Sequence, residues 1–356
     1  MSRVLFIGDP HIRPDNGDEV DILIHEIHSI CREKPVDVIV IGGDVMHYHE
    51  RVFTQALNKA LDFIDKMRKL ATTYILVGNH DAINNSIFLS DHHWMNALKA
   101  WDNVVIVDDI VVHSNPSTDF ILCPYVPPGR LIEAIETKFP REKWLNIPLI
   151  FAHQEIKGCR MGAILSEDGD EWDESYPILV SGHIHDHQRV GLNVYYPGTP
   201  LQHAFGDSDI RVVAYITLNS KEDNPTIDFL PLKNVPRKKV VHLSLDKINK
   251  LNEKLNELND DKTKLKLKID ASNAEFSAFK QTARYKELID NGVKIQLQRV
   301  NKGDGYVNNV SDKNDFSQIL EELVKSDEDD IVKHVYNELF MEKMVIDLFD
   351  DESNDE

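Results

Sequence analysis

The sequence contains little that would place the protein outside the cell or in a membrane. It has three cysteines among 356 residues, an odd number without paired spacing, and this disfavours a disulfide framework. No stretch approaches the run of about 18 apolar residues that a transmembrane helix requires. The first residues, MSRVLFIGDPH, lack the charged-then-apolar pattern of a secretory signal. We therefore expect a protein without membrane contact that is not secreted and stays in the cytoplasm, which is the host cytoplasm if a phage encodes it.

Positive charge is also scarce. The chain carries 40 Lys and Arg against 60 Asp and Glu, a formal net charge of −20, and half of this excess lies in the acidic segment 326–356. Such a balance is unusual for a nucleic-acid-binding protein, which ordinarily presents a basic surface. Bound divalent cations would change the sign of the charge locally, so the net charge alone does not exclude a nucleic-acid substrate.

Three short apolar runs near the start of the chain end in polar clusters. Residues 4–7 precede Gly-Asp, residues 36–41 precede Gly-Gly-Asp, and residues 74–77 precede Gly-Asn-His. Apolar residues at helical spacing lie between them, so the segment predicts β-α-β-α-β with buried strands. Two later apolar runs, IPLIFAH and YPILVSGHIH, likewise end in histidines. Ligands gather outside the carboxyl ends of strands in such sheets, which makes these clusters the candidate site.

The first domain is predicted to cover residues 1–233. Its last part, with the runs QRVGLNVYYPG, RVVAYITL and TIDFLPL, predicts a hairpin followed by antiparallel strands. We expect an α/β (α+β) fold in which a β-sandwich is flanked by helices.

Beyond residue 233 the composition turns to Lys, Asn and Glu, and we expect a small α+β cap domain over residues 234–302. Helical spacing in the cap covers residues 245–258 and 274–292, and alternation predicts two strands, at 264–270 and 293–300. A linker and two amphipathic C-terminal helices are predicted over residues 303–350, followed by the acidic tail 351–356.

The polar residues at the five strand ends share the chemistry of metal ligands. They are Asp9, His11, Asp44, Asn79, His80, His153, His183 and His185. Carboxylate, carboxamide and imidazole groups suit divalent ions such as Mn²⁺, Fe²⁺ or Zn²⁺, and the absence of Cys among them disfavours a closed structural zinc site. Because one ion needs fewer ligands, we expect two ions that share one carboxylate. Any one of these residues alone is more simply a turn former or a helix cap, but recurrence at five strand ends favours a site.

The motifs GDPH, GGD, GNHD, the single His153 after a strand and GHIH occur in the order found in the calcineurin-like metallophosphoesterases, which the chain resembles over roughly its first 205 residues. Within that superfamily it resembles the SbcD-type DNA double-strand-break repair nucleases. Three features carry the finer resemblance: GGDVMH, YPGTPLQHAFGD and the cap-then-helices layout. The compact length is similar to that of phage members. Thr199 and Pro200 stand where relatives often have Ser-Thr or Ser-Ile, which puts only the shape of one DNA-facing loop in doubt.

The resemblance implies a role for each candidate residue. The first of two divalent metal ions would be held by Asp9, His11 and His185. The second would be held by Asn79, His153 and His183. Asp44 would lie between the two ions. His80 would contact the scissile phosphate as a catalytic residue, and His47 would be a second catalytic histidine near the substrate.

The resemblance also implies an activity and partners. It implies a Mn²⁺-dependent DNA exonuclease and endonuclease, with Mg²⁺, Fe²⁺ or Zn²⁺ as alternative ions, that processes DNA ends in repair and recombination. Such a subunit forms a homodimer and works with an SMC-like, SbcC-type ATPase, whose coiled coil would bind the helices within residues 303–350. Packing of these helices onto the cap is the simpler alternative.

Basic residues of the cap are candidates for contact with DNA. Lys264, Lys266 and Lys268 alternate on one strand, and further basic residues follow on a predicted helix, at Lys280, Arg284 and Lys286. A lysine-rich edge strand that prevents sheet aggregation is the simpler alternative. The segment KGCRMG, residues 157–162, could touch the phosphate backbone or be a plain surface loop.

Two other functions are compatible with these residues. A phosphoesterase of the same fold could act on phosphoproteins, cyclic nucleotides or small phosphodiesters, although His47 and the C-terminal segments argue against it. A non-catalytic scaffold that tethers DNA ends is the second alternative, and the complete ligand set argues against that. His187 and His203 flank the motifs and are candidates either for contacts that orient the ligands or for contacts to the substrate.

Overall fold

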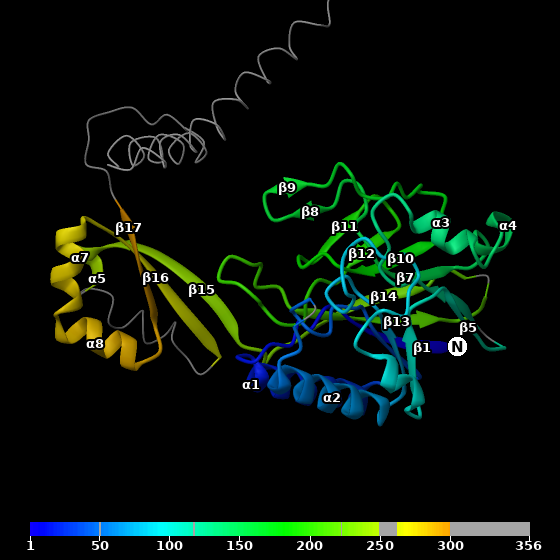
Figure 1. Cartoon of the computed structure of the whole chain (residues 1–356), viewed down its shortest axis with the longest axis horizontal. Helices are drawn as coiled ribbons and strands as arrows, with labels where there is room; N and C mark the ends of the chain where they lie inside the picture. Colours follow the sequence, from blue (N-terminus) through cyan, green and yellow to red (C-terminus); the bar gives the residue numbers. More distant parts are fainter. Residues whose placement is uncertain (50, 117, 222, 249–261, 300–356) are drawn as a thin grey trace, which may run out of the picture. The chain divides into compact units, whose positions relative to one another are not determined.

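The structure is a computed structural model that describes residues 1–299, with the exception of residues 50, 117, 222 and 249–261 (Figure 1). Residues Met1–Val300 form one compact unit. The helices predicted within 303–350 and the tail 351–356 lie outside the described residues, as does most of the helix predicted over 245–258. Among the described helices, none has the length and apolar character needed to cross a membrane.

The first sheet has six strands in the order β14-β13-β1-β2-β3-β4. Their bounds are β1 Ser2–Ile7, β2 Val38–Ile41, β3 Thr72–Leu76, β4 Val104–Val107, β13 Val212–Leu218 and β14 Thr226–Pro231. Strands β1 to β4 are parallel, β13 runs antiparallel to β1, and β14 runs antiparallel to β13. Helices α1 (Gly17–Glu33) and α2 (Thr54–Arg68) connect the first three strands. The predicted β-α-β-α-β segment and the two antiparallel strands are therefore confirmed.

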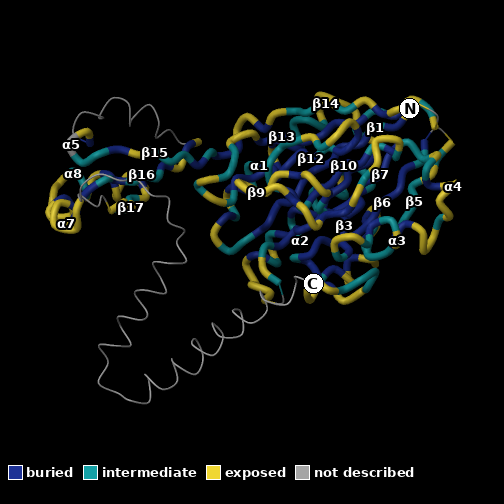
Figure 2. The backbone as a smooth tube through the Cα atoms, turned by 90° about the horizontal axis from the view of Figure 1, so that it is seen from above, coloured by how far each residue is buried: buried dark blue, intermediate teal, exposed yellow. Residues whose placement is uncertain are grey.

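Successive side chains along these strands point to opposite faces of the sheet and so contribute to two different hydrophobic cores. Leu5 and Ile7 of β1 join the apolar faces of α1 and α2, which lie side by side on one face of the sheet (Figure 1). Val4 and Phe6 belong to the other core, between this sheet and a second one. Figure 2 shows the inner strands of the two sheets, such as β3, β7 (Leu149–His153) and β10 (Ile178–Gly182), as largely buried, whereas the edge strand β14 includes exposed residues.

The second sheet also has six strands, in the order β11-β12-β10-β7-β6-β5. Their bounds are β5 Val111–Ser114, β6 Asp119–Leu122, β7 Leu149–His153, β10 Ile178–Gly182, β11 Gln188–Val190 and β12 Val194–Tyr196. The inner strands are parallel, and the edge strands β5 and β11 are antiparallel to their neighbours, which confirms the predicted hairpin. Residues of helices α3 (Leu131–Glu136) and α4 (Arg141–Trp144) join the core on its outer face.

The two sheets pack face to face. Phe151 of β7 stacks on Phe6 of β1 with ring centroids 5.6 Å apart. The loops contain three further short elements. These are the 3₁₀ helix η1 (Asn96–Ala100) and the strands β8 (Arg160–Met161) and β9 (Ile164–Leu165), which pair as a hairpin. The predicted α/β sandwich flanked by helices is confirmed.

The cap is built on a three-stranded parallel sheet in the order β15-β16-β17. Its elements are β15 Arg237–Ser244, α5 Leu245–Ile248, β16 Thr263–Ala271, α7 Asn273–Lys280, α8 Ala283–Asp290 and β17 Lys294–Arg299. Leu265, Leu267 and Ile269 of β16 pack with Phe276 and Phe279 of α7. The boundary predicted at residue 233 stays a prediction.

The cap differs from the sequence prediction in its helices and in its strands. The predicted helix over 274–292 is two helices, because the side chain of Thr282 accepts a hydrogen bond from the Tyr285 amide and begins α8. Strand β15 was not predicted, since its sequence RKKVVHLS alternates poorly and forms a strand by pairing with β16.

The interpretation of a lysine-rich edge strand is wrong, because β16 is the central strand of this sheet. Its lysines also do not share a surface with the basic residues of α7 and α8. The helices pack on the leucine face of β16, whereas the lysines alternate with those leucines and point to the other face.

Candidate metal centre

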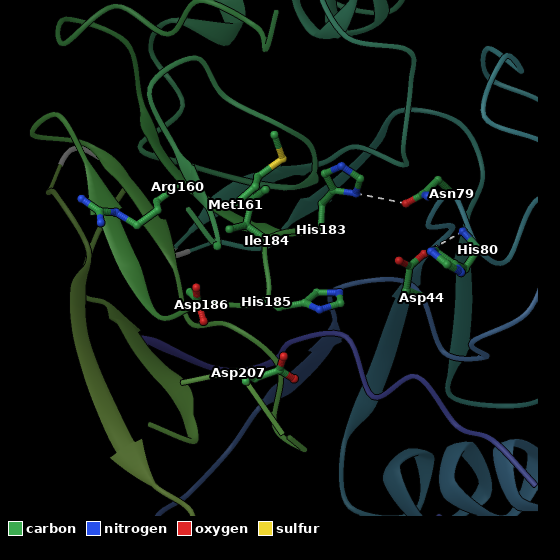
Figure 3. Close-up of a pocket in the computed structure, with 12 residues that line it drawn as sticks. Asp44, Asn79, His80, Arg160, Met161, His183, Ile184, His185, Asp186 and Asp207 are labelled. Atoms are coloured by element: carbon green, nitrogen blue, oxygen red, sulfur yellow. Dashed lines mark hydrogen bonds between the residues drawn. The ribbon is translucent and has the colours of Figure 1, made fainter. Parts of the chain in front are cut away.

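Loops that follow five strands of both sheets bring the candidate residues together. Asp9 follows β1, Asp44 follows β2, Asn79 follows β3, His153 ends β7, and His183 follows β10. All five of these side chains are buried or nearly so. Figure 3 shows Asp44, Asn79 and His183 converging from different strand ends on one pocket.

The first group consists of Asp9, His11 and His185, whose potential ligand atoms all lie within 4.8 Å of one another. His11 Nε2 lies 3.0 Å from His185 Nε2, so two imidazole nitrogens face each other. Asp9 Oδ2 accepts a hydrogen bond of 2.7 Å from the His183 amide, while Asp9 Oδ1 is buried without a hydrogen-bond partner. A buried carboxylate oxygen with no donor fits a bound cation, because an uncompensated oxygen there is costly.

The second group consists of Asn79, His153 and His183. Asn79 Oδ1 lies 3.1 Å from His153 Nε2 and 3.0 Å from His183 Nδ1, and these two nitrogens are 3.3 Å apart. His153 Nδ1 donates to the carbonyl of Gly42 at 2.6 Å. This bond fixes the tautomer of His153, so the lone pair on Nε2 points into the group.

Asp44 lies between the two groups. Its Oδ2 is 3.6 Å from His11 Nε2 in the first group, and its Oδ1 is 3.4 Å from His153 Nε2 in the second. Oδ1 also accepts a hydrogen bond of 2.8 Å from the His80 amide (Figure 3). A carboxylate with one oxygen directed to each group would help to hold a cation in either group.

The pKa values of the buried groups fit a site for cations. Burial raises the pKa of Asp9 to about 8. Burial opposes charge on His153 as well, but the carboxylates of Asp44 and Asp9 overcome this and raise its pKa to about 9. Burial lowers the pKa of His183 to about 3, so this imidazole is neutral and its lone pair is available. Divalent cations would replace the protons on Asp9 and His153.

Backbone strain is concentrated at these residues. His11, Asp44 and His183 have φ values of 43°, 47° and 77°, in the left-handed region that side chains disfavour. Gly43, with φ 106°, lies so close to His153 that an added Cβ would be 2.3 Å from Nδ1. Strain of this kind persists where the surrounding structure holds functional groups in place.

His80 and His47 lie beside the two groups. His80 Nδ1 is 2.5 Å from the His47 carbonyl oxygen and donates to it, which leaves Nε2 for a substrate. His47 Nδ1 is 3.4 Å from His11 Nδ1, and burial, followed by the charge of Arg13, lowers the pKa of His47 to about 4. The set of His11, His47 and His80 is also compact enough to hold an ion, so the geometry allows a further ligand combination.

The sequence itself matches a family model for calcineurin-like phosphoesterases over residues 2–187, which is more than half of the chain. The chain belongs to the calcineurin-like phosphoesterase family. This membership and the geometry of the two groups make it a metal-dependent phosphoesterase, and its His and Asp clusters could hold divalent metal ions.

Two viral relatives of this phosphoesterase align over most of their length. "Putative phosphoesterase 078R" of Invertebrate iridescent virus 3 is 42% identical over 295 residues, which cover 83% of this chain and 84% of the relative. "Putative phosphoesterase 244L" of Invertebrate iridescent virus 6 is 44% identical over 289 residues, 78% of this chain and 97% of the relative. A solved structure described as "GAP50 the anchor in the inner membrane complex of Plasmodium" covers 66% of this chain and 85% of that one, with 13% identity and a TM-score of 0.38, too low to support any argument.

Asp81, which lies outside the predicted ligand set, organises the centre of the phosphoesterase. The carboxylate of Asp81, the last residue of GNHD, accepts from the amides of Val45 and Gly78 and from Trp94 Nε1, and thereby ties the loop after β2 to the loop after β3. Its position at the end of the GNHD motif was the only feature of the sequence that could have indicated this role. The ring centroid of His203 lies 4.8 Å from that of His11, but both ring nitrogens of His203 are buried without a hydrogen-bond partner among the described residues, so an orienting role for His203 stays a prediction. His187 instead bonds the Tyr196 carbonyl, outside the centre.

The two halves of the KGCRMG segment have different surroundings in the structure. Arg160 and Met161 line the pocket that contains the metal centre (Figure 3), whereas Lys157 pairs with Glu171 at 3.1 Å. Only the second half of the segment therefore lines this pocket.

We expect His80→Gln to retain metal and to lose rate. Glutamine cannot transfer a proton near neutral pH, and removal of a general acid typically costs about 10² to 10⁴ in kcat. The measurement is hydrolysis of bis-para-nitrophenyl phosphate in Mn²⁺, with metal content determined on the same sample. His113→Gln, which changes a histidine bonded to Tyr74 outside the centre, is the matched control. Loss of bound metal in His80→Gln would contradict this role.

Proposed function

We propose that the protein is a Mn²⁺-dependent DNA exonuclease and endonuclease that hydrolyses phosphodiesters with two divalent cations. The observation that carries the proposal is a cavity of about 650 Å³ beside His203, whose lining includes four cationic side chains and the carboxylates of Asp15 and Glu19. Arg13 pairs with Asp15, and Lys238 and Lys264 pair with Glu19, so part of this positive charge is neutralised. His203, which contacts His11 of the first group, lines this cavity together with Arg13, Lys238, Lys264 and Lys294. A small phosphoester needs no cations beyond the metal centre, whereas a polynucleotide carries further phosphates on either side of the bond that is cut.

The cap sheet extends this basic surface. Lys264, Lys266 and Lys268 of β16 point away from the cap helices, and Lys294 of β17 pairs in register with Lys266. Lys264 is 2.5 Å from Glu19, so its charge is partly neutralised. Lys266 and Lys294 lie over the ring of Phe205, at 5.9 and 5.5 Å from its centroid. These two lysines are the best candidates for contacts to phosphate.

The residues of the centre have distinct tasks in the proposed reaction. When bound, paired divalent cations supply a nucleophile from water near neutral pH and offset the charge that develops on the phosphate. Asp44 holds the two groups in register, and Gly42 keeps the Nε2 lone pair of His153 pointing inward. His80, held through Nδ1 by the His47 carbonyl, would contact the phosphate and give a proton to the leaving oxygen.

The test compares DNA with a small diester. Wild-type protein should cleave end-labelled duplex DNA in Mn²⁺. A double variant, Lys266→Ala with Lys294→Ala, should raise KM for DNA and reduce its salt dependence by roughly two units of logarithmic slope, because each phosphate contact contributes about one. Its hydrolysis of bis-para-nitrophenyl phosphate should not change.

The control is Lys157→Ala with Lys221→Ala, which removes two lysines that pair with Glu171 and Asp119 away from the cap. Cleavage of the small diester alone by the wild type would identify a generic phosphodiesterase. No turnover of either substrate, even with an ATPase partner present, would favour a scaffold.

The proposal includes a homodimer and an SMC-like ATPase whose coiled coil binds the segment 303–350. That segment lies outside the described residues, so support for the ATPase partner comes from its amphipathic sequence pattern alone.

A further inference from the structure

His80 lines two different cavities. One contains the metal centre, with Asp44, Asn79, His183 and His185 (Figure 3). The other has a volume of about 400 Å³, within the usual range for ligand pockets, and is formed by the loops after β2 and β3. A substrate whose phosphate contacts His80 therefore has an adjoining chemical group within reach of this second cavity.

The lining of the second cavity includes the apolar or aromatic side chains Met46, Tyr48, Val52, Ile83 and Trp94, and the polar side chains Asp91, His92, His93 and Asn96. Neither Lys nor Arg occurs among its described lining residues, and the oxygens of Asp81 are already taken up by backbone amides and Trp94 Nε1. The cavity is thus unsuited to a phosphate and suited to a flat, neutral group.

Tyr48, which lines this cavity, and its neighbour Phe53 are unusually exposed. Tyr48 is 42% exposed and the neighbouring Phe53 is 41% exposed, with ring centroids 5.0 Å apart. The Tyr48 ring is also 4.9 Å from that of His47, beside the metal centre. Rings of this kind are normally buried, and exposed ones near a catalytic centre offer π-faces on which a base can stack.

We propose that this cavity, the Tyr48 pocket, binds a base of the substrate by stacking on Tyr48, next to the phosphate that is cleaved. The inference rests on the proposed nuclease function and refines its substrate. A base inside a duplex is already stacked between its neighbours, so the pocket selects an unpaired nucleotide, as in a single strand or a frayed end. Phe53 supports the Tyr48 ring from the side.

The first experiment compares a single-stranded oligonucleotide with the same strand carrying abasic residues around the cleaved bond. Tyr48→Ala should lower kcat/KM for the normal strand by roughly tenfold, the lower part of the range for loss of one stacked base. It should leave the abasic strand unaffected, and Tyr48→Phe should retain wild-type behaviour on both. Equal losses on both strands, or no loss on either, would overturn the inference.

A second experiment separates the pocket from the nuclease function. Thymidine 5′-(para-nitrophenyl phosphate) carries a base, whereas methyl para-nitrophenyl phosphate does not. If wild-type protein cleaves no oligonucleotide, the nuclease proposal fails, but Tyr48→Ala should still slow only the thymidine diester. Equal slowing of both diesters would refute base stacking.

The third experiment tests whether a second copy of the chain covers the pocket instead. Sedimentation of wild type and Tyr48→Ala should give the same oligomeric state. Dissociation caused by Tyr48→Ala would assign the exposed rings to a contact between copies and overturn the proposal.

Discussion

Asp44→Asn should abolish nearly all phosphoesterase activity. Asparagine keeps the size of the side chain but removes the negative charge and one of the two oxygens that face the two groups, His11 on one side and His153 on the other. The cations stabilise the reaction by several kcal/mol, so we expect a loss of about 10³-fold or more in kcat. Metal content, measured after equilibrium dialysis against Mn²⁺, should fall from two ions per chain to one or fewer.

The matched control is Asp119→Asn, which neutralises a carboxylate paired with Lys221 far from the five strand ends. It should keep both ions and full activity. An Asp44→Asn variant that retains two ions and more than about a tenth of the wild-type rate would show that Asp44 is not the bridge, since a tenth corresponds to only about 1.4 kcal/mol.

The position of the site could be predicted from the sequence because each functional residue directly follows the strand that positions it. Each of the apolar runs before Asp9, Asp44 and Asn79 is short, and each ends in glycine and polar residues, so the strand and its functional residue are read from the same few positions. The rule that ligands gather at the carboxyl ends of parallel strands then places the residues together without knowledge of the tertiary structure. The structure confirms the convergence, while the assignment of individual ligands to each ion stays a prediction.

Features that depend on tertiary contacts could not be predicted in this way. Asp81 organises two loops through bonds to backbone amides, and a backbone amide has no signature in the sequence. The sequence does not distinguish Tyr48 from other aromatic residues in loops, whereas the structure shows that its ring is exposed and lines the same cavity as His80. Strand β15 forms only because β16, some twenty residues later, pairs with it.

The basic surface shows the same limit. The alternation of Lys264, Lys266 and Lys268 correctly predicted one strand face. The pairing of β16 with β15 and β17 decides which strand lies at the edge of the sheet and what the lysine face contacts. The sequence alone therefore could not distinguish a protective edge strand from a phosphate-binding surface.

The glycines that pack against the centre lead to the second large effect, in Gly43→Ala. At φ 106° the alanine backbone is strained, and its Cβ would lie 2.3 Å from His153 Nδ1 and 3.1 Å from the Gly78 Cα, so His153 must leave its bond to the Gly42 carbonyl. Together these costs should destabilise the fold by roughly 3 to 5 kcal/mol, a large share of the usual 5 to 15 kcal/mol. Thermal unfolding with and without Mn²⁺ measures both the loss of stability and the loss of metal binding.

Gly129→Ala separates the two causes of that effect. Gly129 also has a positive φ of 81°, but a Cβ there meets no atom within 4 Å. Its substitution should therefore cost only the backbone term, about 1 to 2 kcal/mol, and the increase in melting temperature on addition of Mn²⁺ should match that of the wild type. If Gly43→Ala behaved like Gly129→Ala in both stability and metal response, the close packing of Gly43 against His153 would have no part in holding the centre together. A deficit that appears only in Gly43→Ala, and that removes the stabilisation by Mn²⁺, would show that the imidazole of His153 is held in place by a backbone that leaves no room for a side chain.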